Sequence, residues 1–127
     1  MNRSRTSAKA AGASFETLIA TGLADMLGDD RIERRTKNGS KDRGDITGVK
    51  TIRGGRVILE CKDYGGRINA TEWLREAAVE AANDGATVGA VVIKKRGTRN
   101  AGEQMVLMSL ADFANLIDGG PDNLRGY

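Results

Sequence analysis

The sequence places two carboxylates and one ammonium where a single turn of the chain would bring them together: Asp45, Glu60 and Lys62. Glu60 and Lys62 are two residues apart, so in a strand they would project side by side from the same face. Asp45 opens the preceding segment, and the Gly54-Gly55 turn would fold that segment back beside Glu60. Two carboxylates that meet across a hairpin repel each other unless a cation lies between them. The pattern therefore predicts a bound cation.

These groups suit the hydrolysis of a phosphodiester bond with the help of a metal ion. Magnesium prefers hard oxygen ligands, and it usually takes one or two carboxylates together with water and a substrate phosphate. Asp45 and Glu60 would supply the carboxylates, and the backbone carbonyl of Cys61 would supply another oxygen. Lys62 would orient or help to deprotonate the attacking water and neutralise charge on the phosphate. The simpler alternative is an exposed ion pair between Glu60 and Lys62, worth ~0–1 kcal/mol.

The composition excludes several other kinds of site. Because the sequence has no histidine, it excludes Ser-His-Asp and Cys-His catalysis and every nuclease that uses a histidine base. The single cysteine, Cys61, excludes an internal disulfide and a multi-cysteine zinc site. It also favours a reducing, cytoplasmic location, in the host cytoplasm if the protein is viral. No apolar run approaches the ~20 residues that a membrane span needs, so we expect no membrane partner.

Charge is unevenly distributed along the chain, whose formal net charge is +3. Eleven basic residues stand against five acidic ones between Arg31 and Arg67, and the segment from Lys94 to Arg99 is basic without any acid. Between these segments, the charged residues of 72–84 are acidic apart from Arg75. This separation indicates one face for a polyanion such as nucleic acid, with ordinary solvated surface as the alternative. The segment 94–99 either extends that face or is a solvated loop.

Hydrophobic periodicity predicts an alternation of helices and strands. The expected helices span residues 8–27, 69–83 and 109–117, and the expected strands span residues 31–36, 45–49, 56–62, 86–94 and 104–108. Asn69 and Glu72 have the spacing of a capping box at the start of the second helix. Glu72, Glu76 and Glu80, four residues apart, predict a solvated face of that helix, and Leu74 with neighbouring alanines predicts the opposite, apolar face.

This order of elements predicts an α/β fold in one domain. A three-stranded meander would be followed by a helical crossover into further strands, which gives one mixed central sheet flanked by helices. We expect residues 9–118 to form the domain, residues 1–8 to form a flexible basic tail, and residues 119–127 to form a loose C-terminal tail.

The spacing of the candidate residues resembles that of a known superfamily. Gly44-Asp45, fourteen intervening residues and then Glu60-Cys61-Lys62 are similar to the PD-(D/E)xK nucleases, which have the restriction-endonuclease-like fold. The likeness covers roughly residues 12–95. It implies an αβββαβ core, Asp45 and Glu60 as ligands of Mg²⁺, and Lys62 as the catalytic lysine. Mn²⁺ would substitute for Mg²⁺.

The same resemblance bears on three further residues. Many members of the superfamily have a glutamate on the first helix that reaches the site, and Glu16 occupies that place, with a solvated helical glutamate as the alternative. Gly44 stands where the name-giving pattern has proline, a common variation. Asp42 is a rival for the role of Asp45, but its place in the loop favours a solvated position or one near DNA.

Within the superfamily, the sequence is most similar to the small Holliday junction resolvases of archaeal and phage type. The shared features are a compact chain, the helical segment Phe15–Leu18, a basic strand and a Gly/Ser loop before Asp45. This resemblance implies a homodimer that acts on branched DNA such as a four-way junction, gripped by the loop between the first two strands. The residues expected to contact phosphates are Arg34, Arg35, Lys37, Lys41 and Arg43.

Two alternatives remain open. The first is another DNA nuclease of the same fold, of nicking, repair or restriction type, although 127 residues leave little room for elements that read base edges. The second is a catalytically silent DNA-binding protein. The intact set of Asp45, Glu60 and Lys62 argues against the second, because a silent site has no need of such a charge cluster.

Overall fold

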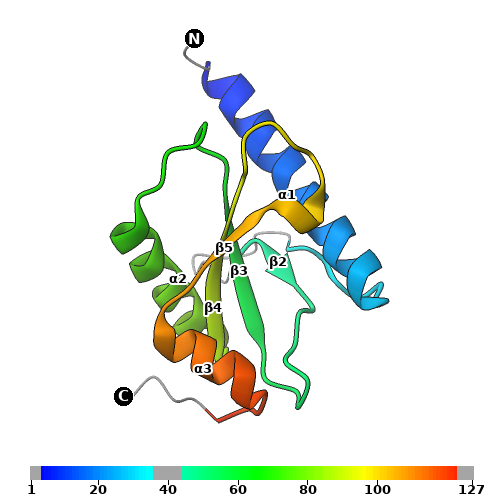
Figure 1. Ribbon diagram of the computed structural model, residues 1–127, viewed down its shortest axis with the longest axis vertical. Helices are drawn as coiled ribbons and strands as arrows, with labels where there is room; N and C mark the ends of the chain where they lie inside the picture. The colour runs from blue at the N-terminus through cyan, green and yellow to red at the C-terminus, as the bar shows by residue number, and fades with distance from the viewer. Residues whose placement is uncertain (1–3, 36–43, 123–127) are drawn as a thin grey trace.

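The computed structural model describes residues 4–35 and 44–122, and within these ranges five strands form one mixed sheet flanked by three α-helices (Figure 1). The elements are α1 (Arg5–Leu27), β1 (Glu33–Arg34), β2 (Ile46–Thr47), β3 (Val57–Lys62), α2 (Ala70–Asp84), β4 (Val88–Ile93), the short 3₁₀ helix η1 (Ala101–Glu103), β5 (Met105–Leu107) and α3 (Leu110–Asp118). The predicted α/β class and the predicted order of elements are confirmed. None of the helices in these ranges is long and apolar enough to cross a membrane.

The strands lie in the sheet in the order β1-β2-β3-β4-β5. β1, β2 and β3 are antiparallel, with Ile46 of β2 opposite Leu59 of β3. α2 then returns the chain so that β4 runs parallel to β3, with Lys62 opposite Ile93, and β5 is antiparallel to β4. This is the predicted meander followed by a helical crossover. It brings the C-terminal ends of β3 and β4 to the same edge of the sheet.

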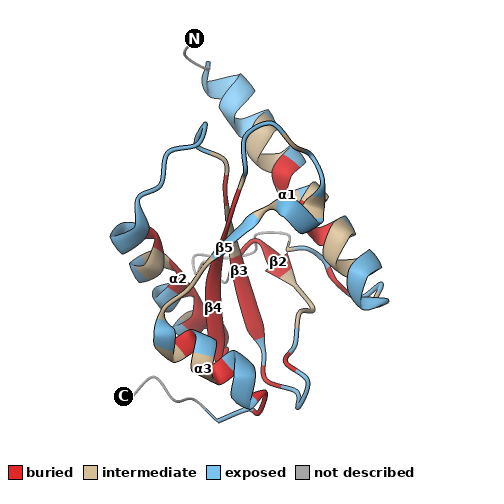
Figure 2. Ribbon diagram, in the orientation of Figure 1, coloured by how far each residue is buried: buried red, intermediate tan, exposed pale blue. Residues whose placement is uncertain are grey.

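Hydrophobic side chains pack on both faces of the sheet because successive residues of β3 alternate between the faces. Leu59 faces α1 and belongs to the same cluster as Phe15, whereas Ile58 faces α2 and belongs to the cluster that contains Trp73. Every residue of β4 is buried, as its apolar run predicts, and Figure 2 shows β4 in the colour of buried residues along its length. The sheet therefore separates a core under α1 from a core under α2.

The first helix begins earlier than the sequence predicts. Ser4 is the N-cap, because its Oγ accepts a hydrogen bond from the Ser7 backbone N–H at 3.1 Å. Residues 5–8, which the sequence assigns to a flexible tail, are therefore helical. The helix ends as predicted before Gly28, whose φ of 60° lies in the left-handed region that favours glycine.

The second helix lacks the predicted capping box. The Asn69 side chain makes no cap hydrogen bond to the backbone at the helix start. Its Nδ2 instead donates to Glu72 Oε2 at 2.7 Å. The capping-box prediction is wrong because the two side chains bind each other and not the backbone N–H groups that a capping box satisfies. The helix still ends before Gly85, as predicted.

The buried face of α2 is rotated relative to the prediction. Trp73 enters the core while Leu74 is only partly buried, and the predicted apolar residues Ala77 and Ala81 are buried as expected. The rotation carries part of the acidic row toward the sheet: Glu72 remains exposed, Glu76 is partly buried and Glu80 is 5% exposed. The prediction that all three glutamates line a solvated face is therefore wrong.

α3 packs on the sheet through polar side chains. β5 pairs with β4 at residues 91–93, and α3 occupies the edge of β4 before that point. There the Gly89 N–H donates to Asp112 Oδ1 at 3.2 Å, and Asn115 Nδ2 donates to the Thr87 carbonyl at 2.7 Å. The helix thus satisfies backbone groups that a neighbouring strand would otherwise satisfy. Its outer face carries large exposed apolar side chains: Leu110, Phe113, Leu116 and Ile117.

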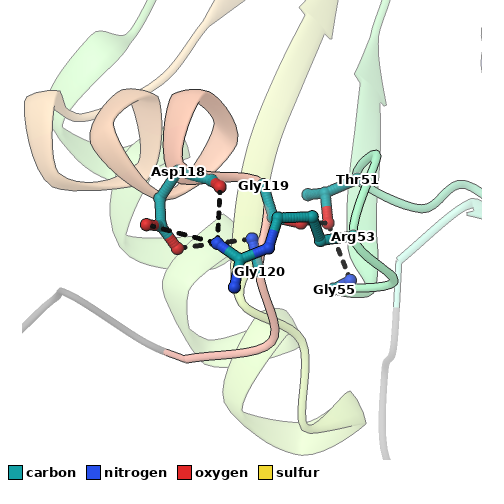
Figure 3. Close-up of polar contacts among 6 residues, drawn as sticks. All are labelled: Thr51, Arg53, Gly55, Asp118, Gly119 and Gly120. Carbon is teal, nitrogen blue, oxygen red and sulfur yellow. Dashed lines mark hydrogen bonds and ion pairs between the residues drawn. The ribbon is translucent and has the colours of Figure 1, made fainter.

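The segment after α3 is anchored to the turn between β2 and β3 (Figure 3). Thr51 Oγ1 donates to the Gly119 carbonyl at 2.6 Å and accepts from the Gly55 N–H at 2.7 Å. The Arg53 N–H also donates to the Gly119 carbonyl at 2.7 Å. Gly119 and Gly120 are buried. These two residues, predicted to begin a loose tail, are therefore packed, and residues 123–127 lie outside the described residues.

Candidate functional site

Asp45 is held against the backbone of β3 at the start of β2. Its N–H donates to the Leu59 carbonyl at 2.8 Å, and its Oδ2 accepts from the Cys61 N–H at 2.8 Å. The residue before it, Gly44, has a φ of 90°, which proline cannot adopt because its ring fixes φ near about −65°. The backbone at position 44 therefore accommodates glycine and excludes proline.

Glu60 and Lys62 lie side by side on the face of β3 that looks toward α2, as predicted. Lys62 Nζ lies 3.7 Å from Glu60 Oε1 and 2.7 Å from Glu76 Oε2 of α2. The ammonium also lies 5.7 Å from the centre of the Tyr64 ring and 5.8 Å from that of Trp73. Lys62 is 8% exposed. An exposed surface ion pair, the simpler sequence alternative, does not describe this residue.

The surroundings of Lys62 keep it protonated. Burial alone would lower its pKa, but the close contact with Glu76 and the negative charges of Glu60 and Glu76 outweigh burial. The pKa of Lys62 is therefore raised above its ordinary value of 10.5. At neutral pH the side chain is an ammonium, which can neutralise an anion and orient water but cannot accept a proton.

Glu16 reaches the neighbourhood of the other candidate residues from α1. Burial raises the pKa of the Cys61 thiol, and the negative charges of Asp45, Glu16 and Glu60 raise it further. Glu16 therefore contributes to the electrostatic surroundings of Cys61. Glu16 is partly buried, and its Oε2 lies 3.4 Å from Arg34 Nη2. The alternative of a fully solvated helical glutamate does not describe it.

The donor set fits a cation that takes few protein ligands. Among residues 4–35 and 44–122, no three acidic or cysteine side chains come together as a metal-binding group. Magnesium usually takes one or two carboxylates and completes its octahedron with water and substrate oxygens. Asp45 precedes Ile46, which pairs with Leu59, and Glu60 follows Leu59, so these are the two carboxylates that would hold such a cation.

The predicted DNA contacts divide between two places. Arg34 lies at the site beside Glu16. The guanidinium of Arg35 lies 3.5 Å from Asp84 Oδ2, and Arg56 lies 3.5 Å from the other oxygen of the same carboxylate. The remaining predicted contacts and the rival carboxylate lie outside the described residues: Lys37, Lys41, Arg43 and Asp42.

Comparison of the chain with protein-family models, with curated proteins and with solved structures gave no significant match.

Glu76 is a residue near the candidate site for which the sequence predicts the wrong surroundings. The sequence analysis places it on a solvated face, whereas its carboxylate contacts Lys62 at 2.7 Å. A usable signal is present, because Glu76 follows Trp73 by three residues and shares its side of the helix. That signal depends on choosing Trp73 over Leu74 as the core residue.

Proposed function

We propose that this protein is a metal-dependent DNA endonuclease with a restriction-endonuclease-like core. The observation that carries the proposal is the meeting of the pattern residues, with Asp45 Oδ2 2.8 Å from the Cys61 nitrogen and Lys62 Nζ 3.7 Å from Glu60 Oε1. The element order α1-β1-β2-β3-α2-β4 supports the proposal, since it is the order expected of that core.

The proposed reaction is attack of water on a DNA phosphorus, with release of a sugar oxygen. Asp45, Glu60 and the Cys61 carbonyl would hold Mg²⁺ or Mn²⁺, which when bound polarises the phosphate and makes water more acidic. Lys62, as an ammonium, would neutralise charge on the phosphate and orient the water. Glu16, which contacts Arg34, would be the glutamate of α1 that reaches the site.

The proposed substrate is branched DNA, and the specific activity is that of a Holliday junction resolvase. A four-way junction offers equivalent strands that a two-fold symmetric homodimer would cut as a pair. The exposed apolar side chains of α3 support self-association, because monomers rarely expose large contiguous apolar patches. The cytoplasmic location expected from the single cysteine belongs to the same proposal. The alternatives are another nuclease of this fold and a silent DNA-binding protein.

Cleavage of labelled four-way junction, linear duplex and single-stranded DNA tests the proposal, with Mg²⁺, Mn²⁺ or EDTA. Wild type is compared with Lys62→Ala and with Lys50→Ala, which removes an exposed lysine paired with Arg56, the residue before the start of β3. We expect symmetric, metal-dependent nicks in the junction that Lys62→Ala abolishes and Lys50→Ala retains.

The other outcomes separate the parts of the proposal. Metal-dependent cutting of plain duplex, lost in Lys62→Ala, would retain the active site and reject junction selectivity. Tight binding of DNA without cleavage under any of these conditions would replace the nuclease with the silent DNA-binding protein.

A further inference from the structure

A groove runs along α1 at the edge of the sheet where β3 and β4 end. One part, of about 500 Å³, lies between α1, the loop after β3 and the loop after β4. An adjoining part, of about 440 Å³, continues along α1 to Arg34. The two parts share Ser14, Leu18 and Arg99 in their linings. The yellow loop after β4 crosses beside α1 in Figure 1, and there Arg99 Nη2 donates to Ser14 Oγ at 3.4 Å.

The lining of the groove is basic. Asp63 is the acidic residue among the side chains that line it, and the cations are Arg34, Lys94, Arg96 and Arg99. α1 contributes small polar side chains to the same lining: Ser14, Thr17 and Thr21. Guanidinium groups beside the small and apolar side chains of α1 suit a chain of phosphates, which they would hold by charge without reading bases.

The loop after β4 is held by its own hydrogen bonds. Lys94 Nζ donates to the carbonyls of Lys95 and Thr98, so its charge is used inside the loop. Gln104 Nε2 donates to the Asn100 carbonyl at 2.9 Å, and Gln104 Oε1 accepts from the Lys95 N–H at 2.7 Å. These bonds fix the backbone on both sides of Arg96, which is exposed. A fixed loop loses little entropy when its arginines bind a ligand.

The loop after β3 makes room for Arg96. A Cβ atom on Gly66 would lie 2.5 Å from Arg96 Cδ, and Gly66 has a φ of 90°. A side chain at position 66 would therefore displace the arginine. The Arg96 side chain thus packs against Gly66 of the loop after β3.

We propose that this groove binds the sugar–phosphate backbone of a DNA strand, with Arg96 and Arg99 contacting phosphates. One end of the groove lies at Asp63, the residue after Lys62 in the chain, and the other lies at Arg34, whose guanidinium contacts Glu16. The inference rests on the proposed nuclease function and adds a binding surface separate from residues 37–43.

Binding of a labelled four-way junction in EDTA, measured by fluorescence anisotropy across a salt series, tests the groove. We expect Arg96→Ala/Arg99→Ala to weaken binding at least about tenfold. The slope of log Kd against log salt should fall by about two, since each lost phosphate contact removes ~0.9. The control Arg53→Ala/Arg75→Ala removes the same charge from exposed positions away from the groove and should keep the slope.

A second variant keeps both arginines and changes a residue of α1 that lines the groove. Thr17→Glu puts a negative charge on an exposed helical position of the groove, where glutamate is a good helix former, and should also weaken binding. Thr71→Glu, at an exposed position of α2, is its matched control. If wild type binds the junction and the groove variants match their controls, the groove does not bind DNA and the nuclease proposal stands. If wild type neither binds nor cleaves DNA, the proposed function fails and the groove fails with it.

Discussion

Lys62 owes its position to a partner on another element. The 2.7 Å contact with Glu76 is shorter than the 3.7 Å contact with Glu60, its neighbour on β3. The ammonium is thus held from both the sheet and α2, beside two aromatic rings. A lysine fixed in this way would meet a phosphate without first having to order its long side chain.

Replacing Glu76 should therefore disturb Lys62 without removing it. In Glu76→Gln the charge that raises the pKa of Lys62 is lost, so this pKa should fall, as an NMR titration of the lysine side chains would detect. Single-turnover cleavage should slow by roughly ten- to a hundredfold, because the ammonium is less well placed. The control is Glu72→Gln, at an exposed position one turn earlier. An unchanged pKa and an unchanged rate would show that Glu76 does not position Lys62.

The Cys61 thiol should make stability depend on alkaline pH. Its pKa is raised above its ordinary value of 9.0, so the thiol contributes stability that is fully present below about pH 9. That stability is lost as pH rises, because the unfolded chain releases its proton first. Urea unfolding at about pH 8 and about pH 10.5 should show a larger loss for wild type than for Cys61→Ala. An equal loss in both would contradict the assignment, since Lys62 is present in each.

The sequence predicts which residues of β3 share a face, but it does not predict which residues of other elements contact them. Spacing along one strand fixes that Glu60 and Lys62 share a face, and the hairpin brings Asp45 beside them. Those relations depend on local geometry alone. The contact of Lys62 with Glu76 depends on how a distant helix is rotated, which no local spacing determines.

For α2, the sequence predicts the length and position of the helix but not its rotation about its own axis. Its length and its position between β3 and β4 follow from hydrophobic period and from the glycine that ends it. Its rotation follows from which large residue packs on the sheet, and here Trp73 belongs to the same buried cluster as Ile58. The strand order is predictable because the apolar run of β4 requires cover on both faces.

α3 offers a prediction about polar burial. Asn115 is fully buried, and its Nδ2 donates to the Thr87 carbonyl at 2.7 Å. Asn115→Ala should lower the free energy of unfolding by about 1–3 kcal/mol, because it leaves that buried carbonyl unsatisfied. Asn69→Ala is the matched control, and since Asn69 makes no cap hydrogen bond its cost should stay below about 0.5 kcal/mol. Equal costs in urea unfolding would contradict both assignments.

The molecule as a whole presents chemically different surfaces. Basic groups line the groove beside α1, while the opposite end of the sheet carries the turn that anchors the segment after α3. The apolar outer face of α3 adjoins that turn, since a Cβ on Gly119 would lie 2.8 Å from the side chain of Ile52, itself 94% exposed. Self-association through this face would leave the groove of each copy open to DNA.

Phe113 tests that arrangement. It is 47% exposed, between Leu110 at 82% and Ile117 at 69%. If a homodimer forms through α3, Phe113→Glu should raise its dissociation constant at least about tenfold, as sedimentation over a concentration series would measure. Val79→Glu, at a 56% exposed position of α2, is the control and should leave the constant unchanged. A wild type that stays monomeric at every concentration would reject the homodimer.

The polar face of α3 also bears on aggregation. By binding the backbone at Thr87 and Gly89, Asn115 and Asp112 close the part of the β4 edge that β5 leaves uncovered. Val88–Ile93 is six uncharged residues rich in β-branched side chains, the composition from which cross-β fibrils grow. Detachment of α3 would open that edge to the same strand of another chain. By covering this edge, α3 would prevent β4 from pairing with the same strand of another chain.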